Sequence, residues 1–232
     1  MAETFPTRAH KEDQYGALGE MLADVAADIG APTTDVTRER WAAVMVGIAS
    51  VDDVIEAEDH TMTAPEMVEV LGMGPDDPYS VRAAQNLIDA TRYTFEATDL
   101  DAHMGSRVEE AVACLHLLVG ADPGGDVIDE RDVQQLADLT AAGQMLDVVR
   151  DAREDVELFP QFSVRQLQLG GLKKLTQHAS RMDRDTWRAA IRATHKSGLD
   201  RYLLRASTHS LLARVIPFNN PRVREDELEL MA

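Results

Sequence analysis

Apolar side chains recur along most of this chain at the three- to four-residue spacing of α-helices, and the alternating pattern of strands is nearly absent. Glycine and proline fall mainly between the periodic segments, as in the stretches GAP, GMGPDDP and ADPGGD. The pattern predicts about nine helices and no sheet. The expected helices cover 13–29, 35–60, 64–72, 80–98, 102–120, 126–158, 163–182, 184–197 and 199–215.

The residue types at the ends of these segments indicate where each helix begins and stops. Asp35 is the expected N-cap of the second helix, and the sixth should be capped within Asp126–Asp129. Short loops and the lack of a sustained heptad favour an all-α, compact, single-domain helical bundle over 1–216. Residues 217–232, with two prolines and mixed charge, should form an extended or disordered tail.

The composition of the chain argues against several classes of protein. The net charge of −18 argues against nucleic acid as a general partner, because binding to phosphates relies on Lys and Arg. A single cysteine excludes an intrachain disulfide and a cysteine-rich zinc site. No long apolar run or secretory signal pattern is present, so a cytoplasmic protein with no transmembrane segment is expected.

The charge is unevenly spread along the chain. Residues 161–214 hold eleven Lys or Arg against three Asp, whereas the rest of the chain is strongly acidic. This asymmetry fits three interpretations: complementarity within the molecule, a docking face for an acidic partner, or a site for an anionic ligand.

The second predicted helix changes from apolar to acidic. Its run from Trp41 to Val51 has no polar face and is expected to be buried on all sides. Four carboxylates, Asp52, Asp53, Glu56 and Asp59, then share one side of the helix at about 100° per residue.

The sixth predicted helix repeats this arrangement. Asp147, Asp151 and Asp155 follow one another at a spacing of four residues, and Glu154 lies beside them. Either acidic set could be a solvated face, and Arg150 or Arg153 could pair with the second set. Crowded carboxylates on apolar helices otherwise need a proton, a basic partner or a cation. Two facing sets with Mg²⁺ between them would form a receptor for a diphosphate.

At these residues the sequence resembles the class I isoprenoid synthases, which comprise the trans-prenyl diphosphate synthases, the squalene and phytoene synthases and the class I terpene cyclases. The stretch SVDDVIEAED resembles the family's first aspartate-rich motif, DDxxD, with Glu56 in place of the last Asp. The paired arginines that usually follow this motif in prenyl synthases are missing, and HTMTAPEM stands there instead.

The second motif allows two alignments. Gln144, Asp147 and Asp151 resemble the QxxDDxxD pattern of prenyl synthases, with Val148 replacing one Asp. Residues 150–155, RDARED, are similar to the RDxxED of squalene and phytoene synthases. Both alignments assign the same helix to metal binding.

The resemblance implies an isoprenoid-synthase-like helical bundle and a prenyl diphosphate substrate, ionised with the help of Mg²⁺. Asp52, Asp53 and Asp151 would be the catalytic residues. The metal-binding set would be Asp52, Asp53, Glu56, Asp147, Asp151, Glu154 and Asp155. The diphosphate-binding candidates are Arg107, Arg150, Lys173, Lys174 and the Arg201-Tyr202 pair, which is similar to an Arg-Tyr pair near the end of bacterial terpene cyclases.

The reaction after ionisation is open between chain coupling and cyclisation. Aromatic residues make up 5% of the chain, which favours coupling, because cyclases stabilise cations with aromatic faces. The alternative function is a non-catalytic helical subunit or scaffold that docks a partner through the Arg-rich C-terminal half, and the missing arginines favour it. A homodimer or a heteromeric partner is compatible with either function.

Overall fold

The structure, a computed structural model, describes residues 8–55, 62–121 and 128–197, except for the side chains of 8–12, 52–55 and 195. Within these ranges the chain forms eight α-helices and no strand, so the predicted all-α bundle is confirmed there. The ninth predicted helix, 199–215, and the tail 217–232 lie outside the described residues. The helices are α1 (Arg8–Asp28), α2 (Asp35–Ile55), α3 (Ala64–Val70), α4 (Pro78–Glu96), α5 (Leu100–Gly120), α6 (Glu130–Leu158), α7 (Val164–Ala179) and α8 (Arg184–Ser197).

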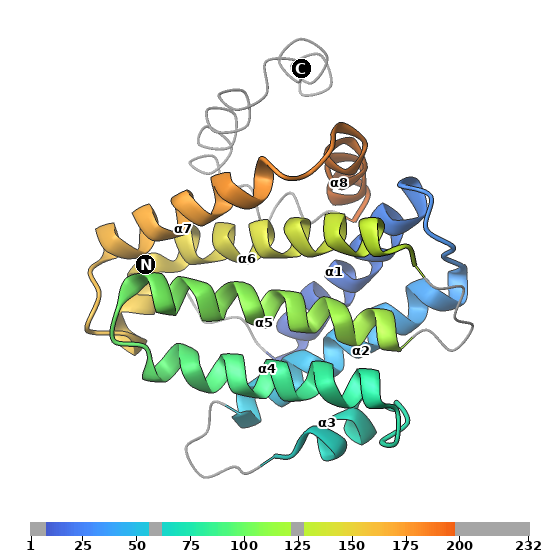
Figure 1. The fold of residues 1–232 in the computed structure, drawn as a ribbon, viewed down its shortest axis with the longest axis horizontal. Coiled ribbons are helices and arrows are strands. Elements are labelled where there is room, and N and C mark those ends of the chain that lie inside the picture. Colours follow the sequence, from blue (N-terminus) through green and yellow to red (C-terminus); the bar gives the residue numbers. More distant parts are fainter. Residues whose placement is uncertain (1–7, 56–61, 122–127, 198–232) are drawn as a thin grey trace.

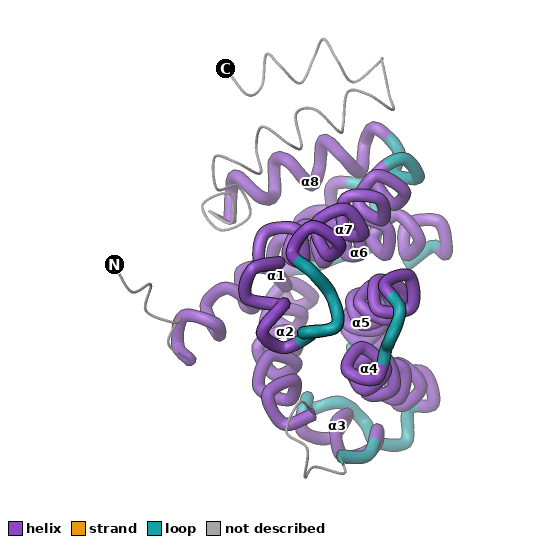
Figure 2. Tube along the Cα trace, turned by 90° about the vertical axis from the view of Figure 1, so that its left-hand side faces the viewer, coloured by secondary structure: helices purple, strands orange, loops and turns teal. Residues whose placement is uncertain are grey.

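Consecutive helices pack as three pairs, α1 with α2, α4 with α5, and α6 with α7. Figure 2 shows α1 and α2 on one side of the bundle, α4 and α5 on the other, and α6 and α7 above them. The short helix α3 packs against α4, and α8 packs against α1. The central helix α5 contacts α2, α4, α6 and α7, so it joins the pairs into one bundle.

The helix ends follow from local side-chain chemistry. Asp129 caps α6 by accepting a hydrogen bond from the Arg131 amide at 2.8 Å, as the sequence predicts. The predicted cap of α2 is wrong by one residue, because Asp35 is already helical and Thr34 Oγ1 accepts from the Thr37 amide at 3.2 Å. After α1, Gly30 has a φ of 100°, which ends the helix at the expected place.

Two apolar clusters form the core. One lies among α1–α5, the start of α6 and α8, and includes the fully buried Trp41 and Leu117. The other joins α5, α6 and α7 around Met145 and Leu167. The apolar run of α2 is not buried on all sides as predicted, because Ala43 is exposed. In the part of the chain that the structure describes, no helix is both long and apolar enough to cross a membrane.

The basic C-terminal segment meets the acidic N-terminal helix. Arg192 Nη2 lies 2.9 Å from Asp28 Oδ2, and Lys196 Nζ lies 2.8 Å from Asp24 Oδ2. These exposed pairs place α8 on α1, although each contributes only about 0.2–1 kcal/mol. Complementarity within the molecule therefore accounts for part of the charge asymmetry.

Candidate functional site

The first predicted acidic segment lies at the end of α2. Asp52 and Asp53 belong to its last turn, directly after the buried Val51, and their side chains are not described. Glu56, Arg201 and Tyr202 lie outside the described residues. The roles assigned to these five residues therefore stay predictions.

The two acidic helices run in the same direction along the bundle. Both α2 and α6 pack against α5, and in Figure 1 both run from right to left. Their C-terminal ends consequently point toward the same end of the bundle.

The second predicted segment forms a row of carboxylates along α6, which consists of Asp147, Asp151 and Asp155 and is called the α6 row below. Helical geometry gives these residues one face, while the neighbouring Val148 and Ala152 are buried in the core. The side chains of Asp147 and Asp151 are 42% and 33% exposed. The row therefore lies at the boundary between core and solvent.

Arg150 bridges two members of this row. Its Nη2 lies 2.6 Å from Asp147 Oδ1, and its Nε donates to Asp151 Oδ1 at 2.7 Å. A second bond joins Nη2 to Asp151 Oδ2. The predicted alternative, in which Arg150 satisfies the acidic set, is thus confirmed for these two aspartates. Arg153, the other basic residue considered, is exposed.

Arg107 brings a second guanidinium to the row from α5. With the Gln144 amide oriented so that its oxygen faces α5, that oxygen accepts from Arg107 Nη2 at 3.0 Å and from Nε at 3.3 Å. Arg107 Nη1 also lies 3.1 Å from Glu110 Oε2, and the other oxygen of Glu110 accepts from Thr94 Oγ1 at 2.6 Å. This buried network fixes Arg107 opposite α6.

Burial and the neighbouring carboxylates both disfavour the charged form of two members of the row. Burial raises the pKa of Asp155 to about 6; the nearby Arg107 opposes this shift, whereas Asp151 and Asp147 add to it. The pKa of Asp147 is also raised, first by burial and then by Asp151, while Arg150 opposes the shift. The pKa of Arg150 is raised, chiefly by its hydrogen bond to Asp151.

Counting charges gives the chemical character of the site. The row and the exposed Glu154 contribute four carboxylates, while Arg150 and Arg107 contribute two cations, one of which also serves Glu110. The surplus can be relieved by a proton or by a cation. Carboxylate oxygens suit Mg²⁺, but no three His, Cys, Asp or Glu side chains among the described residues lie close enough together to hold one ion. A metal at the row therefore needs Arg150 to move or ligands from another segment.

The two lysines predicted to bind diphosphate do not join the described network of the row. Lys173 Nζ pairs with Asp101 Oδ1 at 3.3 Å, and both side chains are more than half exposed. Lys174 lies on the same helix, α7, and is partly exposed, with no ion pair to the described carboxylates. Of the predicted diphosphate ligands with described side chains, Arg107 and Arg150 are the ones that meet the α6 row.

A second polar arrangement on α6 was missed by the sequence analysis. Asp138 is 2% exposed, and its Oδ1 lies 2.7 Å from Nδ1 of His178 on α7. The partners are 40 residues apart, so no local motif joins them. The one available signal was an aspartate in the apolar stretch LADLTAAG, because a buried carboxylate needs a partner.

Comparisons of the chain with protein-family models, with curated proteins and with solved structures gave no match. Its function is therefore argued from its own residues, together with the local resemblance carried by its two acidic motifs.

Proposed function

We propose that this chain is a Mg²⁺-dependent enzyme of the isoprenoid synthase type, which ionises a prenyl diphosphate and then couples or cyclises the product. The observation that carries the proposal is the surplus of half-buried carboxylate at the α6 row, where burial raises the pKa of Asp155 to about 6. Such a surplus is unfavourable without a counter-ion and would be offset by a bound cation. The resemblance of the two acidic motifs to those of the synthases supplies the substrate class.

The donor set fits the proposed metal in its chemistry. Asp147, Asp151 and Asp155 offer oxygen ligands only, and Asp52 and Asp53 at the end of α2 would add the further carboxylates that the α6 row lacks. Bound there, Mg²⁺ would neutralise the diphosphate and favour its departure as a Lewis acid. Chemistry of this kind requires both acidic helices.

The arginines of the site have a defined part in the proposed reaction. Arg150 holds Asp147 and Asp151 by charge-assisted hydrogen bonds. If a cation bound these carboxylates, the Arg150 guanidinium would be able to donate to a phosphate oxygen. Arg107, fixed by Glu110 at 3.1 Å, presents a second guanidinium from α5.

The second candidate function is a non-catalytic helical subunit, and the pairing of Arg150 favours it. In that case the guanidinium is the permanent counter-ion of Asp147 and Asp151, and no metal is needed. The docking of a partner through the Arg-rich half is less well supported, because Arg192 and Lys196 already pair with α1.

The direct test is diphosphate release. The purified chain is incubated with Mg²⁺ and geranyl, farnesyl or geranylgeranyl diphosphate, with and without isopentenyl diphosphate. Release should fall at least about a hundredfold in Asp151→Asn, which removes one metal ligand without changing the side-chain volume. Asp132→Asn, on the first turn of the same helix, is the matched control and should keep wild-type release. No release from folded wild-type protein with any of these substrates would favour the non-catalytic subunit.

A further inference from the structure

The turn between α6 and α7, residues 159–163, packs against the turn between α4 and α5, and Figure 1 shows both turns at the same end of the bundle. Gln161 Nε2 donates to the Ala97 carbonyl at 3.1 Å. The ring centroids of Phe159 and Phe95 lie 5.2 Å apart. These contacts join the α6–α7 turn to the end of α4.

Two backbone hydrogen bonds close the α6–α7 turn. The Phe159 amide donates to the Asp155 carbonyl at 2.8 Å, and the Phe162 amide donates to the Phe159 carbonyl at 3.0 Å. The first bond also satisfies one of the last carbonyl groups of α6. The turn therefore fixes the C-terminal end of the helix that carries the α6 row.

The imidazole of His103, on α5, is buried beneath this turn. His103 is 1% exposed, and its ring centroid lies 4.5 Å from that of Phe159 and 5.0 Å from that of Phe162. Its Nδ1 lies 3.2 Å from the Thr94 carbonyl oxygen, which can only accept, so the neutral ring carries its proton on Nδ1. Nε2 is buried and has no hydrogen-bond partner among the described residues. A proton added at Nε2 would therefore lack an acceptor in this part of the chain.

The surroundings of His103 disfavour a positive charge. Burial lowers the pKa of the imidazole; the bond to the Thr94 carbonyl opposes this shift, and the charge of Arg107, one turn further along α5, adds to it. The groups packed against the ring from α4 and from the α6–α7 turn are a carbonyl and two phenyl rings, which carry no charge. The carboxylates of Glu110 on α5 and Asp155 on α6 interact with Arg107 instead. The attraction of a phenyl ring for a cation is smaller than the cost of burying an ion without an acceptor.

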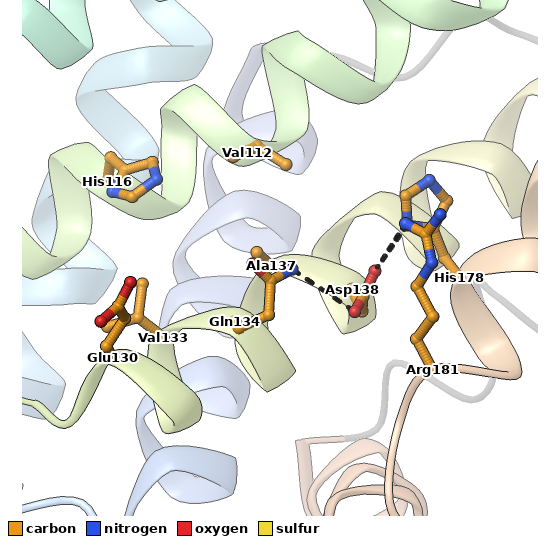
Figure 3. Close-up of a pocket in the computed structure, with 9 residues that line it drawn as sticks. All are labelled: Val112, His116, Glu130, Val133, Gln134, Ala137, Asp138, His178 and Arg181. Atoms are coloured by element: carbon orange, nitrogen blue, oxygen red, sulfur yellow. Dashed lines mark hydrogen bonds and ion pairs between the residues drawn. The ribbon is translucent and has the colours of Figure 1, made fainter.

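His103 differs in this respect from the other two histidines whose side chains the structure describes. His178 Nδ1 lies 2.7 Å from the Asp138 carboxylate, as Figure 3 shows, and this carboxylate would stabilise a positive charge. His116 lines the same pocket, is partly exposed, and has its Nδ1 2.6 Å from the Tyr79 hydroxyl. Of the three, His103 is the one whose protonation conflicts most with its packing.

We propose that His103 is an acid-sensitive switch, which holds the α6–α7 turn closed as the neutral imidazole and opens the turn when it is protonated. Opening lets the charged ring reach water, where an ion is more stable than in the core. The stabilisation by His103 is complete above about pH 6.5, the ordinary pKa of histidine, and is lost as the pH falls from there toward the lowered pKa of the folded state. The inference does not depend on the proposed function, because it concerns only the closing of a turn.

The experiment measures amide hydrogen exchange in the full chain by NMR, at about pH 7.5 and about pH 5, as protection factors that are corrected for the intrinsic pH dependence of exchange. The amides of Phe159 and Phe162 report on the turn, and the Ala31 amide, which donates to the Ala26 carbonyl at 2.9 Å after α1, is the internal reference. We expect protection at the turn to fall at least about fivefold at the lower pH and that of Ala31 to change less than about twofold. An equal fall at both places, or no fall at the turn, would overturn the proposal.

Two variants remove the titrating group in different ways. His103→Asn keeps a donor near the position of Nδ1, and His103→Phe keeps a ring of similar size. In each of them protection at the turn should change less than about twofold between the two pH values. His116→Asn, which removes another buried imidazole of the same helix, is the matched control and should keep the loss of the wild type. Asp155 titrates in the same range but is present in every protein, so the difference between proteins isolates His103. An undiminished loss in a folded His103 variant would contradict the proposal.

Discussion

Helix α6 carries aspartates in two environments that differ in how their charge is offset. Asp138 is almost fully buried, and His178, Arg181 and Gln134 surround its two oxygens. Asp155, about five turns further along, is surrounded mainly by other carboxylates, and burial raises its pKa to about 6. The buried charge is satisfied by the chain itself, whereas the half-buried row is left with a surplus. The comparison indicates that Asp138 stabilises the fold, whereas the row keeps a surplus of negative charge, which the proposed function assigns to a cation.

The largest expected effect is the loss of stability when the buried Asp138–His178 pair is broken. Asp138→Ala should lower the free energy of unfolding by about 3 kcal/mol, because it leaves the buried His178 without its partner and opens a cavity. Denaturant unfolding measures this change. A loss below about 1 kcal/mol would show that Asp138 is not the anchor that its burial indicates.

Removing Arg150, the counter-ion of the row, should lower the stability of the protein by a smaller amount. Arg150→Gln breaks the bonds to Asp147 and Asp151 and should cost about 1.5 kcal/mol in Mg²⁺-free buffer. The same substitution leaves the carboxylates to a cation, so added Mg²⁺ should recover most of the loss of stability. If Mg²⁺ gives no recovery, Arg150 is the permanent partner of the row and the non-catalytic function is favoured.

The helices and the contacts within each helix could be predicted from the sequence, because both depend on residues close together in the chain. The acidic row, the cap at Asp129 and the pairing of Arg150 within its own helix are all local. The Asp138–His178 pair could not be predicted, because it depends on the packing of α7 against α6. The contact of Lys173 on α7 with Asp101 on α5 at 3.3 Å likewise depends on helix packing and could not be predicted, and the diphosphate-binding role of Lys173 stays a prediction.

The smallest expected effect is the gain in stability when the charge of Asp155 is removed. Asp155→Asn should raise the free energy of unfolding by about 1 kcal/mol at pH 7.5, a value reduced from the full pKa shift because solvent screens a half-buried group. The pKa of Asp155 is raised from 3.8 to about 6 on folding, so its charge destabilises the folded state above pH 6 and not below pH 4. The gain should therefore shrink between pH 6 and pH 4, in parallel unfolding curves of both proteins. A gain in stability that is independent of pH would show that the charge of Asp155 does not destabilise the folded protein.

The measurement that tests the account most directly is calorimetric titration of Mg²⁺, in the presence of inorganic diphosphate, into the wild-type chain and three variants. We expect binding to the wild type and to Asp132→Asn, and binding weakened at least about tenfold in Asp151→Asn and in Asp155→Asn. Absence of binding to the wild type, or equal affinity in all four proteins, would contradict the claim that the α6 row is a cation site.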